Sequence, residues 1–201
     1  YAVRGNTPTS YTRGGRLVRI DYGQRDAAAD NSTPPLRVTL GYDVRCLAGA
    51  TACTTYSKTK WPDTPYDQIC SGTETCTGLN APTFFTRFML TSITTKVRAG
   101  TTYAGVDSWD LTYDFLDSGT AADGVLVLKE IVHSGLVGGT KALDPISFTY
   151  AQLDNRVDRL TDGYSPLPRW RVRTITSETG QVTTVNYSPQ ECTPSTLPTP
   201  D

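Results

Sequence analysis

Histidine is almost absent from this sequence, which contains a single one, His133. Any Ser-His-Asp or Cys-His catalytic arrangement would have to use that residue. His133 follows the apolar segment 124–132 and precedes a glycine turn, where a histidine usually has a structural role or faces solvent. We therefore expect no catalytic residue and no enzymatic activity in this chain.

The chain also lacks a surplus of either charge and lacks any long apolar run. Its 19 basic and 20 acidic residues leave a net charge of −1. Such a balance gives no electrostatic attraction toward nucleic acid or anionic lipid. No apolar run approaches the roughly 18 residues that a membrane-spanning helix needs. We expect neither a nucleic-acid partner nor a membrane span.

Helical periodicity is missing as well, because no segment repeats its apolar residues every 3.6 positions over three turns. Alternation of apolar and polar residues, which is typical of half-buried strands, occurs instead. In 108–115 it places Trp109, Leu111, Tyr113 and Phe115 on one face. Segment 124–132 is apolar on both faces, which favours a central strand. Further strands are expected within 16–23, 36–46, 91–98 and 146–152.

Glycine, proline, asparagine and aspartate clusters separate these segments, as in turns between antiparallel strands. Segment 169–188 is predicted to be a hairpin, with Gly180 at positive φ in its short turn. The fold class predicted is all-β in a single domain over 1–201, with an antiparallel multi-stranded sheet arranged as a meander, a sandwich or an open barrel. Residues 189–201 form a proline-rich tail, and we expect both ends of the chain to be cuts through a longer polypeptide.

Five cysteines are present, at positions 46, 53, 70, 76 and 192. The spacing C-x6-C-x16-C-x5-C lacks the C-x2-C pairs of zinc knuckles. The first interpretation is two local disulfides, Cys46–Cys53 and Cys70–Cys76; a crossed pairing of the same four, a metal site or free thiols are the alternatives. Disulfides indicate an oxidising compartment, so a secreted or cell-surface protein is expected. Cys192 is then either free or paired beyond residue 201.

The segment 46–82 is long and irregular, which is uncommon in a compact domain unless the loop is functional or tied down. Two short disulfides would tie it. Trp61 and Tyr66 are expected to pack this loop onto a face of the sheet. They are also the best candidates for a ligand contact.

Charged residues offer weak alternatives to this non-catalytic interpretation. Asp110, Asp114, Asp117 and Asp123 do not follow the spacing of a calcium-binding loop, and a solvated strand face explains them better. No metal or cofactor is expected. Arg169, Arg171 and Arg173 form a basic row, which cross-strand pairing with nearby carboxylates such as Asp154 and Glu178 explains better than binding of an anion.

Several stretches resemble one family when they are taken together in order. They are GGRLVRIDYG (14–23), WPDTPYDQIC (61–70), FFTRFMLTSITTKVRAG (84–100), YAGVDSWDLTYDF (103–115), DNRVD (154–158) and RWRVRTITSETGQVTTVNYS (169–188). Together they resemble the region just before the YD repeats of large secreted RHS-repeat proteins of actinobacteria. The resemblance covers nearly the whole chain and includes Cys46, Cys53, Cys70 and Cys76.

This resemblance implies a structural role. RHS and YD repeats form a long β-sheet that winds into a hollow shell, which commonly encloses a C-terminal toxin or effector. The expected function is therefore a non-catalytic domain that builds or caps such a shell, with the rest of its own parent chain as partner. The alternative is an extracellular adhesion or glycan-binding module, with Trp61 and Tyr66 contacting a cell-surface glycan.

Overall fold

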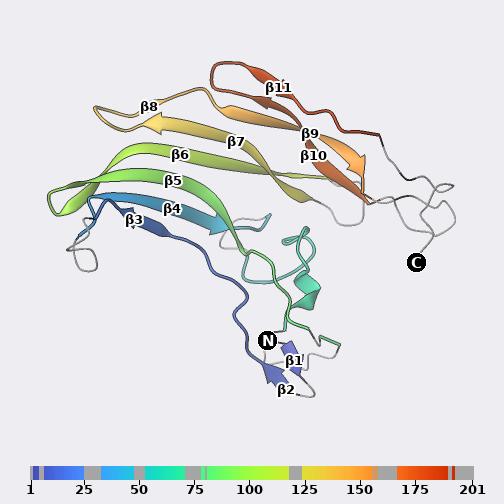
Figure 1. The fold of residues 1–201 in the computed structure, drawn as a ribbon. Helices are drawn as coiled ribbons and strands as arrows, with labels where there is room; N and C mark the ends of the chain where they lie inside the picture. The colour runs from blue at the N-terminus through green and yellow to red at the C-terminus, as the bar shows by residue number, and fades with distance from the viewer. Residues whose placement is uncertain are drawn as a thin grey trace. The chain divides into compact units, whose positions relative to one another are not determined.

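The structure is a computed structural model that describes residues 2–4, 7–24, 33–47, 53–70, 78–79, 81–117, 124–155, 157, 167–189 and 192. Every regular element among these residues is a β-strand, except the short 3-10 helix η3 (Tyr66–Gln68). The predicted all-β class is confirmed (Figure 1). No helix in the described ranges is long and apolar enough to cross a membrane.

Eleven strands are described, and they run antiparallel to their partners. They are β1 (Ala2–Arg4), β2 (Thr7–Thr9), β3 (Arg19–Tyr22), β4 (Leu36–Val44), β5 (Phe88–Ala99), β6 (Thr102–Leu116), β7 (Val125–Gly135), β8 (Lys141–Ala142), β9 (Ile146–Asp154), β10 (Pro168–Thr176) and β11 (Val182–Thr184). β1 and β2 pair only with each other. The other nine form a sheet of order β11-β10-β9-β7-β6-β5-β4-β3, with β8 paired to β7.

The chain divides into two compact units, and β6 and β7 contribute to both. The first unit comprises residues 1–111 and 132–143, and the second comprises 112–131 and 144–201. β7 lies between β6 and β9 in the strand order, so its predicted central position is confirmed.

In the first unit, β3, β4, β5 and the start of β6 form a meander of neighbouring antiparallel strands (Figure 1). A β-bulge between Gly41 and Tyr42 interrupts the pairing of β4 with β5. A Cβ at position 41 would collide with the Ser92 hydroxyl, so a larger residue there would require the Ser92 side chain to turn away. The extra residue of this bulge is Thr91 on β5, since Gly41 pairs with Ser92 and Tyr42 with Leu90. The alternation expected over 36–46 does not appear in the burial of β4, where every residue except Asp43 is half-buried.

β6 follows the predicted alternation closely. Trp109, Leu111, Tyr113 and Phe115 are half-buried, while the polar residues between them, Asp110, Thr112 and Asp114, are exposed. The register of β6 with β5 is regular at Trp109 and Asp110, and its shift lies earlier, opposite Thr95 and Lys96.

In the second unit, β9, β10 and β11 form an antiparallel meander that ends in the expected hairpin. Gly180 has a φ of 82°, as predicted for the turn, and the backbone N–H of Ser177 donates to the carbonyl of Gln181 at 2.9 Å. Arg173 is the extra residue of a β-bulge in β10, so its side chain does not continue the alternation of Arg169 and Arg171. The predicted basic row is therefore interrupted.

The buried apolar side chains do not lie in the sheet. Among the described residues they are Cys46, Cys53, Trp61 and Cys70, all within the irregular segment that follows β4. The apolar side chains of the nine sheet strands are half-buried or exposed, and Ser134 is the one strand residue that is buried.

Candidate functional site in the stapled loop

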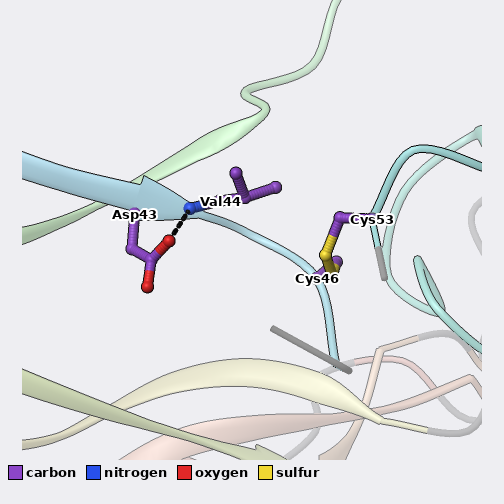
Figure 2. Close-up of a disulfide and its surroundings, with 4 residues drawn as sticks. All are labelled: Asp43, Val44, Cys46 and Cys53. Carbon is purple, nitrogen blue, oxygen red and sulfur yellow. Dashed lines mark hydrogen bonds between the residues drawn. A yellow bond between two sulfur atoms is a disulfide. The ribbon is translucent and has the colours of Figure 1, made fainter. Parts of the chain in front are cut away.

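The disulfide Cys46–Cys53 closes the start of the irregular loop, two residues after β4 ends (Figure 2). Its two Cα atoms lie 6.0 Å apart, a normal separation for a disulfide. The predicted local pairing is therefore confirmed for these two cysteines. Beside it, the Asp43 carboxylate accepts a hydrogen bond from the Val44 N–H at 2.6 Å, at the end of β4 (Figure 2).

The remaining cysteines are described in part. Cys70 is disulfide-bonded and buried, whereas Cys76, its predicted partner, lies outside the described residues. Cys192 is a free, half-buried thiol.

Trp61 is the centre of the loop, because its side chain has 0 % of its surface exposed. Its indole packs on the Tyr56 ring, with centroids 4.9 Å apart, and meets the Phe85 ring edge-on at 6.4 Å. Val44 and Tyr66 complete its surroundings. The indole has no exposed surface in this conformation, and it packs the loop as expected from the sequence. The ligand contact considered for Trp61 stays a prediction. Tyr66 is half-buried against the same cluster.

An ion pair between Arg45 and Asp63 ties the loop to the residue that follows β4. The Asp63 side chain is only 7 % exposed, and that of Arg45 is 21 % exposed. The Arg45 backbone N–H also donates to the Arg87 carbonyl at 2.9 Å, next to the start of β5. A charge pair this deeply placed holds the loop in one arrangement, because separating it would leave a desolvated charge.

His133 lies in a cross-strand cluster of the first unit. Its Nε2 is 3.0 Å from Asp107 Oδ1, and its ring stacks on Trp109 with centroids 4.7 Å apart and planes 6° apart. Between described residues, Asp107 is its one side-chain hydrogen-bond partner. The cluster therefore offers no nucleophile to complete a catalytic triad, and it links β7 to β6. The absence of enzymatic activity remains a prediction.

Three residues of the sheet, Arg37, Tyr113 and Tyr150, have raised pKa values. A hydrogen bond to Asp21, directly opposite on β3, raises the pKa of Arg37, although desolvation opposes the shift. Burial raises the pKa of Tyr150 on β9, whose hydroxyl donates a hydrogen bond to the Leu128 carbonyl on β7 at 2.5 Å. Burial alone raises the pKa of Tyr113.

The predicted pairing of the basic row with carboxylates does not appear in the described part of the chain. Arg171 donates to the Asn155 side-chain oxygen at 2.8 Å, and Arg169 donates to the Pro168 carbonyl at 3.0 Å. Neither forms an ion pair with Asp154 or Glu178, which are both described. No group of three His, Cys, Asp or Glu side chains in the described ranges could hold a metal ion.

Comparisons of the chain with protein-family models, with curated proteins and with solved structures find no match.

Proposed function

We propose that this chain is a non-catalytic structural domain of a large secreted RHS-type protein, where it builds or caps a β-shell around a C-terminal effector or toxin. The loop that begins with the Cys46–Cys53 disulfide, called the stapled loop, holds together the part of that domain next to the end of β4. The role rests on the resemblance of the sequence to the region before the YD repeats and on one structural observation about the sheet.

That observation is that no apolar side chain of the described sheet strands is fully buried. Strands as long as the 15 residues of β6 carry apolar side chains that are half-buried at most. A sheet in a self-contained domain normally packs one face against a second layer and buries it. Single-layer strands with moderate burial on both faces suit a wall whose faces are completed by other segments of a longer chain.

Incompletely paired edges support the same role. β11 pairs only with Thr174–Thr176 of β10, so the first half of β10 has no second partner among the described strands. Unpaired strand edges are templates for further strands, which neighbouring segments of a shell would supply. Without those segments the edges should pair between copies.

We therefore expect the 201-residue chain to self-associate as its concentration rises, with an average mass above the 21.9 kDa monomer by light scattering. Val182→Lys, on the edge strand β11, should reduce the association because lysine on an edge opposes pairing. Val137→Lys is the matched control: Val137 is 76 % exposed and Val182 58 %, but Val137 lies in the turn between β7 and β8. A chain that stays monomeric at high concentration would contradict the shell role.

A further inference from the structure

A pocket of about 810 Å³ opens beside the stapled loop in the first unit. It shares Phe85 with the cluster around Trp61, and its other lining residues lie outside that cluster. Three segments line it: residues 13–17, Tyr42 on β4, and residues 84–88 at the start of β5. Its volume falls within the range of about 300–1,000 Å³ that is usual for small-ligand sites. Its lining is dominated by arginines and aromatic rings.

The three pocket arginines each lie over an aromatic ring. The guanidinium carbon of Arg16 is 3.9 Å from the centroid of Phe88, and that of Arg13 is 4.7 Å from Phe85. Arg87 lies over Tyr56 at 5.4 Å. Stacking on an aromatic ring holds the flat face of a guanidinium in place. The N–H groups at the edge of the guanidinium stay available to an acceptor that binds two of them, such as carboxylate or sulfate.

No carboxylate neutralises these arginines in the described part of the chain. Arg19, Arg37 and Arg45 in the same unit form ion pairs with aspartates, whereas Arg13, Arg16 and Arg87 form none. The pocket lining contains no acidic residue. Three arginines without an ion-pair partner among the described residues therefore line one pocket in a chain whose net charge is −1. Their positive charge favours an anionic ligand.

Apolar ring surface and open backbone complete the pocket. Phe84 is 62 % exposed, and no arginine lies over its ring. No atom lies within 4 Å of the positions that side chains at Gly14 and Gly15 would occupy, so the backbone there is open to a ligand. These features suit a ring-shaped molecule that carries acidic groups.

A peptide would be a poorer occupant, because extended peptides bind by adding a strand to an open edge. The edge of β4 at this pocket is already occupied by residues 17–18. The Leu40 N–H donates to the Val18 carbonyl at 3.0 Å, and the Tyr42 hydroxyl donates to the Leu17 carbonyl at 2.7 Å.

We infer that this pocket binds an acidic oligosaccharide, with carboxylate or sulfate groups on Arg13, Arg16 and Arg87 and a sugar ring against Phe84. The binding site is thus distinct from Trp61, the residue first considered for glycan contact. This inference does not depend on the shell role: a chain that proves monomeric and free-standing could still bind the saccharide.

The test is isothermal titration calorimetry of the 201-residue chain with tetragalacturonate, a carboxylated oligosaccharide. Its methyl ester is the neutral control of the same ring structure, and tetraglutamate is the acidic peptide control. Tetragalacturonate should bind with a Kd between micromolar and millimolar and weaken as salt rises. The ester and the peptide should each bind roughly tenfold or more weakly, since charged hydrogen bonds and ring contacts both contribute.

Two pairs of variants separate recognition from folding. Gly15→Asp adds a negative charge where there is open space, and should weaken binding roughly tenfold or more, whereas the neutral Gly15→Asn should retain most of it. Arg16→Gln should also weaken binding, whereas Arg173→Gln, which removes a charge in the other unit, should not.

Three outcomes would overturn the inference: no binding of tetragalacturonate, equal binding of its ester, or equal effects of Gly15→Asp and Gly15→Asn. Equally tight binding of tetraglutamate would also overturn it, because the pocket would then recognise acidic peptides rather than sugars. Circular dichroism of each variant shows that the fold is retained in the proteins that are compared.

Discussion

Trp61→Ala is expected to lower the free energy of unfolding by about 3–5 kcal/mol, the largest effect of any single substitution we consider. Trp61 is the largest fully buried side chain in the described part of the protein. Its removal would leave a cavity between Tyr56, Phe85 and Val44 that a disulfide-closed loop cannot fill freely. The loop would then lose its core although its covalent link remains.

Urea denaturation followed by circular dichroism measures this change. Phe84→Ala is the control, because Phe84 is an aromatic residue of the same neighbourhood that is largely exposed; it should cost less than about 1 kcal/mol. A Trp61→Ala variant as stable as the Phe84→Ala variant would show that the loop is not organised around Trp61.

Asp63→Ala is expected to cost about 3 kcal/mol. The substitution removes the partner of Arg45 and leaves a poorly solvated guanidinium at the end of β4. The expected cost is at the lower end of the range for broken buried ion pairs, because the Arg45 side chain retains some contact with solvent.

A double variant tests whether charge isolation causes that loss. Arg45→Met with Asp63→Leu replaces the pair by apolar side chains of similar reach, and it should recover much of the stability lost in Asp63→Ala. Thermal and urea unfolding of the single and double variants give the coupling. A double variant less stable than Asp63→Ala would mean that the pair stabilises the loop by its own attraction.

Strand positions were the most predictable part of the fold, because alternation depends only on which face of a strand is covered. The sequence predicted β6 down to the individual half-buried residues from Trp109 to Phe115. It could not predict the bulges at Gly41 and Arg173, since a bulge depends on how two strands pair and not on either strand alone.

The loop was predictable in its first covalent link and in the packing role of Trp61, but not in the residues that Trp61 contacts. The seven-residue separation of Cys46 and Cys53 favoured a local disulfide. Whether Trp61 faced solvent or the loop interior depended on Phe85 and Val44, which are distant in sequence. The segment 46–82 indicated that Trp61 packs the loop, but it could not indicate these two contacts.

The arginine pocket was missed altogether. Arg13 lies outside the strands expected from the sequence, Arg16 lies at the start of the strand expected within 16–23, and Arg87 is more than seventy positions away in the chain. The three meet because residues 13–17 and the start of β5 line the same pocket. The only local signal was that these arginines are next to glycine or phenylalanine in the sequence. Such neighbours are too common to indicate a site.

The central claim is that this sheet works as part of a much larger secreted chain. The most direct test is an immunoblot, with antibodies to this segment, of culture supernatant from the source organism under reducing conditions. The account predicts a polypeptide far larger than 21.9 kDa. A free species near 21.9 kDa, with no larger precursor in the cells, would contradict it and would make ligand binding the better candidate for the function.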